Sequence, residues 1–451
     1  MTPEQIESAV AAAMPQAVEE LRRLAAIPSV AFPGHPEEPV FAAAAMTEEL
    51  LRSVGLPRVQ QVPVEGSFPA IFGEAPAPPG MPTVLLYAHY DVQPAGDPAA
   101  WRTPPFEPTL IDGKLYGRGC ADDKSGILSH ITALRAFQGR FPVGIKVIIE
   151  GQEEYAGERL EAFVERNPGL LRADAIVVAD TGNPRIGDPA VTTSLRGMAA
   201  FTIEARTLRE PLHSGSFGGA APDALAALMR MLTSLHDDNG DIRVPGLPRG
   251  TFLGQGPSEE EFRKTAGVLD GVSLVGSGSL ADRLWASYAI TVTGLDVPTV
   301  SGAVNAVQPA ARARVTVRVP PAGDPKATVN AVVEFLRKVA PWGVELSFTD
   351  LTVGSGFQAD SGGKARAALN RAMERAFGRP PRDVGAGGSI PLVNTLLKQF
   401  PAAEILLFGA EDEDAAIHAP NERVDLEELR RVATTEALFL HELSLPSALG
   451  V

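Results

Sequence analysis

The sequence is short of three things: cysteine, basic side chains and long apolar runs. Its single thiol, Cys120, cannot form a disulfide within the chain, and so little cysteine is typical of a reducing compartment. No segment approaches the roughly 20 consecutive apolar residues that a membrane-spanning helix needs. The first residues also lack the basic start and apolar run of a signal peptide. We therefore expect a cytoplasmic protein that has no membrane segment.

The deficit of basic residues argues against nucleic acid as a partner. The chain has 40 Lys and Arg against 55 Asp and Glu, a formal net charge of -15, whereas nucleic-acid binding depends on cationic contacts to phosphate. With 45% hydrophobic and 21% charged residues, the composition is that of a globular protein. At 451 residues the chain is longer than a single hydrophobic core usually supports, so two domains are expected.

Between Val84 and Asp180, apolar strand-like segments alternate with helical ones. This alternation predicts right-handed crossovers and an α/β domain with a mostly parallel central sheet. After Asp180, apolar and polar residues alternate within segments such as 311–319, which predicts an antiparallel sheet with one face in water. The stretch 237–282 is rich in Gly and Pro and has the length of a functional loop or an insertion.

From Gly356 the chain returns to alternating helices and strands. The predicted fold class is therefore α/β, with a smaller α+β domain inserted into a discontinuous catalytic domain. The predicted limits are residues 1–195 and 355–451 for the catalytic domain and 196–354 for the inserted domain.

Residues of the kind that bind metals follow the apolar strands of the first part of the chain: His89 and Asp91, the pair Glu153 and Glu154, and Asp180. In open parallel sheets, ligands gather outside the carboxyl ends of the strands. We interpret His89 as a metal ligand whose orientation and basicity Asp91 would set. Of the two adjacent glutamates, one can bind metal while the other takes a proton from a metal-bound water. Each residue alone also fits a surface, hydrogen-bonding or turn role.

Two further residues complete this set. Asp122 lies among small residues just before a helical segment, where its two oxygens could bridge two metals or its side chain could cap the helix. His418 follows the strand-like segment 404–408. The neighbouring thiol of Cys120 is not expected to be a nucleophile, because no Cys-His pairing is apparent. Together, the ligand-type residues at strand ends and adjoining turns predict a two-metal hydrolase.

The order of these motifs resembles that of the M20 metallopeptidases. This group includes carnosinase-like dipeptidases, glutamate carboxypeptidase, aminoacylase and succinyl-diaminopimelate desuccinylase. The resemblance covers nearly the whole chain, and the long stretch 237–282 is similar to the carnosinase-like branch. The motifs that carry the resemblance are His89-x-Asp91, Gly119-x-x-Asp122-Asp123-Lys124, Glu153-Glu154, Asp180, His213-Ser214-Gly215, Gly387-Gly388-Ser389-Ile390-Pro391 and His418-Ala419-Pro420-Asn421-Glu422.

The resemblance implies a zinc-exopeptidase-like catalytic domain with two Zn²⁺ per subunit, for which Mn²⁺ or Co²⁺ could substitute. Three carboxylates, a bridging hydroxide and two Zn²⁺ sum to zero charge, and such a pair can lower the pKa of water while polarising a carbonyl. The implied ligands are Asp122, shared by both ions, with His89 and Asp180 at one site and Glu154 and His418 at the other.

The resemblance also implies roles for residues that do not bind metal. Glu153 would be the general base that deprotonates the bridging water and passes the proton to the leaving amine, with Asp91 behind His89. His213, from the inserted lid domain, would reach the active site of a neighbouring subunit and stabilise the oxyanion. The enzyme would then be complete only as a homodimer joined through the lid domain.

Substrate-binding residues are implied as well. Asn305 and Arg318 would contact the substrate, with Arg318 clamping its terminal carboxylate. The backbone at Gly388 and Ser389 would approach the same anion. The family's usual Asn-x-Ile-Pro motif is replaced here by Asn305-Ala306-Val307-Gln308-Pro309, so the match to the family is incomplete at Asn305.

The function predicted is therefore that of a di-zinc hydrolase that cleaves dipeptides or short peptides with a free C-terminal carboxylate. An N-acyl amino acid amidohydrolase is the alternative, because both reactions cleave an amide beside a free carboxylate. A non-catalytic relative that acts as a binding module is a third hypothesis, which the presence of Glu153 and all five ligand-type residues disfavours.

Overall fold

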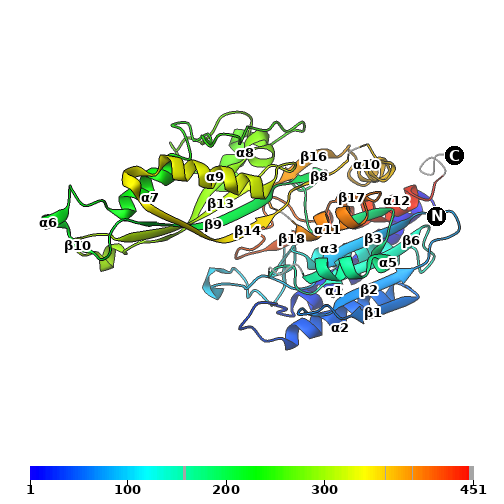
Figure 1. Ribbon diagram of the computed structural model, residues 1–451. Coiled ribbons are helices and arrows are strands. Elements are labelled where there is room, and N and C mark those ends of the chain that lie inside the picture. The colour runs from blue at the N-terminus through cyan, green and yellow to red at the C-terminus, as the bar shows by residue number, and fades with distance from the viewer. Residues whose placement is uncertain (156–158, 361, 389, 446–451) are drawn as a thin grey trace. The chain divides into compact units, whose positions relative to one another are not determined.

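The computed structural model describes residues 1–155, 159–360, 362–388 and 390–445 (Figure 1). The chain divides into two compact units. The first unit comprises Met1–Thr193, Ala359–Asp383 and Leu392–Val451, and the second comprises Ser194–Gln358 and Val384–Pro391. The domain limits drawn from the sequence stay a prediction.

The first unit is built on a mixed sheet whose strands run in the order β1-β2-β6-β3-β7-β17-β8. The central neighbours β6, β3, β7 and β17 pair in parallel, while β1, β2 and β8 join antiparallel. The predicted α/β class is confirmed, and the parallel pairing is confined to the centre of the sheet. These strands are β1 (Arg58–Val62), β2 (Ala70–Ala75), β3 (Thr83–His89), β6 (Gly144–Glu150), β7 (Ala175–Val178), β8 (Ala190–Leu195) and β17 (Glu404–Leu407).

Helices pack on this sheet and on one another. Helix α3 lies between the sheet and α12, and it also contacts α1. The helices of the first unit are α1 (Pro3–Ala25), α2 (Glu38–Ser53), α3 (Lys124–Arg135), α4 (Arg159–Arg166), α5 (Pro168–Leu171), α10 (Lys364–Phe377), α11 (Pro391–Gln399) and α12 (Leu426–Glu442), with a 3-10 turn η1 (Pro98–Ala100). A small separate sheet has the order β18-β5-β4, from β4 (Thr109–Ile111), β5 (Lys114–Tyr116) and β18 (Arg423–Asp425).

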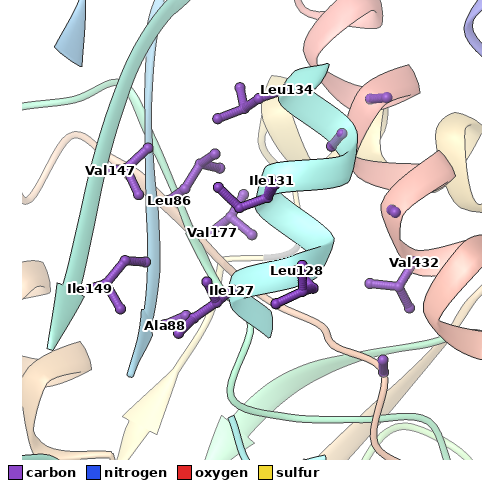
Figure 2. Packing of buried hydrophobic residues seen from close by; sticks show 14 of the residues in the cluster. Leu86, Ala88, Ile127, Leu128, Ile131, Leu134, Val147, Ile149, Val177 and Val432 are labelled. Atoms are coloured by element: carbon purple, nitrogen blue, oxygen red, sulfur yellow. The ribbon is translucent and has the colours of Figure 1, made fainter. Parts of the chain in front are cut away.

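The core of the first unit forms where α3 meets the sheet. Figure 2 shows Ile127 and Ile131 of α3 facing Ala88, Leu86 and Val177 of the strands. All five side chains are buried. Because full burial of a large aliphatic side chain contributes roughly 1.5–3 kcal/mol, this contact fixes α3 against the strand ends.

The second unit is an antiparallel sheet in the order β11-β13-β9-β14, covered on one face by α7 and α9. Apolar residues at every second position of β9 and β13 point into this core, as alternation predicts. Its elements are β9 (Gly197–Arg206), β10 (Leu212–His213), α6 (Ser214–Phe217), α7 (Ala224–Thr233), α8 (Glu259–Ala266), the π-helical turn η2 (Asp282–Ala286), β11 (Ala289–Asp296), η3 (Val300–Gly302), β12 (Ala306–Val307), β13 (Ala310–Val319), α9 (Pro325–Val339), η4 (Pro341–Gly343), β14 (Glu345–Gly354) and β15 (Phe357–Gln358), while β16 spans Arg382–Ala386.

No helix among the described residues has both the length and the apolar composition needed to cross a membrane.

Candidate active site

Three neighbouring parallel strands deliver ligand-type residues to one edge of the first unit's sheet. Strand β3 ends at His89, which is paired with Glu150 at the end of β6. Glu153 and Glu154 follow β6, and Asp180 follows β7. Because parallel strands end at the same edge, residues far apart in the sequence converge there.

Asp122 lies between the two histidines that the sequence singled out. Its Oδ1 is 3.0 Å from Nε2 of His89, and its Oδ2 is 2.9 Å from Nε2 of His418. The same His418 nitrogen lies 3.1 Å from Oε2 of Glu154, and the His89 nitrogen lies 4.0 Å from Oδ1 of Asp180. One carboxylate therefore faces both halves of the cluster.

The structure brings the predicted ligand-type residues and Glu153 into two groups of three. In each group the side-chain donor atoms lie within 4.8 Å of one another. Imidazole nitrogen and carboxylate oxygen are donors that suit Zn²⁺ and Mn²⁺, so the residues present fit a pair of such ions. The groups are His89, Glu153 and Asp180, and Asp122, Glu154 and His418.

Asp91 supports this cluster from behind. Its carboxylate accepts hydrogen bonds from the backbone N-H groups of Glu153 and Glu154, at 3.0 and 3.1 Å. Nδ1 of His89 lies 3.1 Å from the carbonyl oxygen of Asp91 and 3.4 Å from its carboxylate. The residue therefore contacts the His89 ring and fixes the loop that carries both glutamates.

Glu422 is a buried acid to which the sequence analysis assigned no role. Its carboxylate accepts hydrogen bonds from the N-H groups of Gly119, Ala121 and Asp122, at 3.0–3.1 Å, and pairs with Arg118 at 2.5 Å. Gly119 has a φ of +79°, a conformation that glycine adopts without steric cost. Glu422 thereby joins the Asp122 segment to the segment that carries His418.

Glu411 is a second acid that the sequence analysis missed. One oxygen each from Glu411, Asp122 and Asp180 lie within 4.8 Å of one another. The carbonyl of Glu411 accepts a hydrogen bond from Asn183 N-H at 2.9 Å, and a Cβ on Gly182 would come within 2.2 Å of that oxygen. The available signal was its position: Glu411 follows the parallel strand β17 much as Asp180 follows β7.

Three acids of the cluster, Glu153, Asp180 and Glu411, hold their protons strongly in the metal-free protein. Burial, which disfavours the charged form, raises the pKa of Glu153 to about 8, and it also raises the pKa values of Asp180 and Glu411. Hydrogen bonds to Asp122 and then Glu154 raise the pKa of His418 to about 10. Bound cations would favour the deprotonated forms, since they offset the repulsion among the carboxylates.

Cys120 lies beside this cluster but is fully buried, and burial raises the pKa of its thiol well above the usual value. Its environment is therefore that of an unreactive thiol, in keeping with the sequence analysis.

The remaining predicted site residues lie in the second unit. His213 ends β10 and is exposed, and it pairs with Ala306 of β12. The carbonyl of Asn305 accepts a hydrogen bond from Ser214 N-H at 2.9 Å, so His213 and Asn305 lie on neighbouring segments. Arg318 lies on β13, half-buried, and Gly388 is exposed. Ser389 lies outside the described residues.

An α/β unit with a His and carboxylate cluster at its strand ends, in a chain with an inserted α+β unit, defines a metal-dependent hydrolase. Comparison with known proteins supports this class. The chain belongs to peptidase family M20/M25/M40, which matches residues 85–442.

The relatives and solved structures agree with this assignment. The chain is 42% identical over 366 residues to the cysteinylglycine-S-conjugate dipeptidase of Corynebacterium striatum, an alignment that covers 80% of each protein. It is 29% identical over 436 residues to the Beta-Ala-His dipeptidase of Rattus norvegicus, covering 90% of this chain and 88% of the relative. The crystal structure of human carnosine dipeptidase 1 matches with a TM-score of 0.81 and 26% identity, over 98% of this chain and 99% of that one.

The metal-free protein is expected to lose stability as pH rises. The folded-state pKa of Glu153 is raised from 4.5 to about 8 and that of His418 from 6.5 to about 10. The stability that these groups contribute is fully present below their unfolded-state pKa values and is lost as the pH rises through their folded-state pKa values. The melting temperature of chelated protein should therefore fall between about pH 4.5 and 10, most steeply from about pH 6.5 to 8, where both groups contribute. Metal-loaded protein should vary less, and a rising melting temperature for the chelated form would contradict this account.

Proposed function

We propose that the protein is a two-metal dipeptidase that cleaves dipeptides or short peptides with a free C-terminal carboxylate. The observation that carries the proposal is the position of Asp122, with one carboxylate oxygen facing His89 and the other facing His418. The relatives named as dipeptidases support the substrate class, and a lone buried thiol supports the proposed cytoplasmic location.

The proposed cofactor is a pair of Zn²⁺ ions, with Mn²⁺ or Co²⁺ as substitutes. When bound, such ions lower the pKa of water and polarise the substrate carbonyl. Asp122 would be shared, with His89 and Asp180 on one side and Glu154 and His418 on the other.

Glu153 is the proposed general base. Its side chain belongs to the same group of donor atoms as His89 and Asp180, and its backbone N-H is held by Asp91. A general base must be deprotonated when it accepts the proton, and bound cations would favour the deprotonated carboxylate of Glu153. Glu153 would take a proton from the attacking water and return it to the leaving amine.

Residues of the second unit are the proposed substrate contacts. Arg318 would bind the terminal carboxylate, with the backbone at Gly388 and Ser389 beside it, and Asn305 would contact the substrate. His213 would act on the active site of a second subunit in a homodimer formed through the second unit. The exposure of His213 at the end of β10 supports that arrangement.

A substrate panel tests the reaction class. Zinc-loaded protein should cleave unblocked dipeptides, and a chelator should abolish the cleavage, because the bound ions would supply the activated water. N-acetyl amino acids in the same panel serve as the comparison. Cleavage of the acylated compounds alone would replace the dipeptidase by an amidohydrolase, and cleavage of neither would favour a non-catalytic relative.

Exchange of Glu153 for Gln separates the base from the ligands. Glu153→Gln should keep its metal content but lower kcat roughly 10²- to 10⁴-fold, the usual contribution of a general base. The neighbouring Glu154→Gln should instead lose metal affinity. Measured metal content and turnover of both variants distinguish the roles, and a Glu153→Gln enzyme with full activity would refute the base assignment.

The proposed cross-subunit role of His213 predicts complementation. His213→Ala and Glu153→Gln chains should each be nearly inactive alone. Co-expressed in equal amounts with two affinity tags, they should form heterodimers in which one site of two has both residues. The unseparated mixture should recover about a quarter of the wild-type sites, and the purified heterodimers about half. Purified heterodimers with no activity would show that His213 does not act across the interface.

A further inference from the structure

Arg196 is a buried cation without an acidic partner. Arg196 is 8% exposed. Its Nε is buried and has no hydrogen-bond acceptor among the described residues. Nη1 donates a long hydrogen bond of 3.4 Å to the carbonyl of Arg283. No described carboxylate forms an ion pair with Arg196. A buried charge without a counterion is costly, so an anion that binds from outside the chain would offset that cost.

Arg196 and Arg318 lie close enough for the charge of one to act on the other. Arg318 of β13 is paired with Met198 of β9, and Arg196 lies two residues before Met198, immediately before β9 begins. The two arginines are thus diagonal neighbours, within reach of each other for long side chains. Arg318 also has no carboxylate partner among the described residues. Burial, and secondly the positive charge of Arg318, lower the pKa of Arg196 to about 10. Arg196 is therefore still charged at neutral pH.

A glycine leaves space beside the Arg196 guanidinium. The backbone N-H of Arg196 donates to the carbonyl of Ala386 at 3.2 Å, so the glycine segment runs alongside it. A Cβ on Gly387 would lie 3.2 Å from Nη2 of Arg196. Any side chain at this position would crowd that donor. Two guanidinium groups and a bare backbone segment therefore lie together within the second unit.

We propose that Arg196 is a second carboxylate-binding residue, which holds the C-terminal carboxylate of the substrate jointly with Arg318. The inference rests on the proposed function for the identity of the ligand. A carboxylate has about four lone-pair sites on two oxygens, enough for donors from both guanidinium groups. With two cations on one monoanion, the enzyme would discriminate strongly against substrates whose terminus is blocked.

Arg196→Gln tests the proposal with a matched pair of substrates, a dipeptide and its C-terminal amide. For the free acid, kcat/KM should fall roughly 10- to 100-fold, mainly through KM, because a hydrogen bond to a charged group is lost. For the amide, kcat/KM should barely change. Arg196→Lys should recover part of the loss by restoring the charge. Arg206→Gln, at an exposed arginine of β9, is the control and should match wild type for both substrates.

Gly387→Ala gives an independent test that leaves both charges in place. The added methyl group should crowd Nη2 of Arg196 and again weaken the acid more than the amide. An equal loss for acid and amide in Arg196→Gln and Arg196→Lys would show that Arg196 only supports the fold, and unchanged kinetics would also overturn the proposal.

A binding experiment separates this inference from the reaction itself. Glycylglycine and glycylglycine amide are titrated by calorimetry into metal-free wild type and Arg196→Gln, whose melting temperatures are compared first. Preference for the acid in wild type, lost in the variant, would support the site even if no dipeptide were cleaved. Equal preference in both proteins would contradict it.

Discussion

The constraint on which the site depends is the electrostatic repulsion among closely spaced carboxylates. Asp122, Glu153, Asp180 and Glu411 lie in one cluster with two imidazoles, in which Asp122 and His89 are buried, the other three acids are half-buried and His418 is exposed. Such a group is stable only if protons or cations neutralise it. In the metal-free protein, the raised pKa values of Glu153, Asp180, Glu411 and His418 serve this purpose. Divalent cations would also neutralise the carboxylates, and every ligand-type residue is placed to coordinate them. The geometry therefore favours a metal site over a structural ion-pair network.

The scaffold holds these charges together through contacts between distant segments. Asp91 fixes the loop after β6, and Glu422 joins the Asp122 turn to the His418 loop across about 300 residues of sequence. Gly182 lets the chain after β17 approach the chain after β7. Behind them, the packing of α3 against the central strands sets where those strands end. The positions of the ligand-type residues therefore follow from the core.

Local patterns made much of this arrangement predictable. Apolar runs identified the central strands, and because parallel strands end at one edge, the residues after them could be expected to meet. Residues whose surroundings depend on distant segments could not be found in this way. Glu422 and Glu411 look like ordinary loop acids, and Arg196 gains its neighbour only from the register between β9 and β13. Helix α8 was missed within 237–282 because it buries no residue and so shows no apolar periodicity, although a capping box at Ser258 and Glu261 marks its start.

The most direct test of the central claim is anomalous X-ray diffraction from crystals of the zinc-loaded protein, recorded at the zinc absorption edge. Two peaks should appear at the strand ends of the first unit. Each of the two carboxylate oxygens of Asp122 should contact a different ion. His89 and Asp180 should coordinate one ion, and Glu154 and His418 the other. A single ion, or ions that leave Asp122 uncoordinated, would contradict a shared two-metal centre.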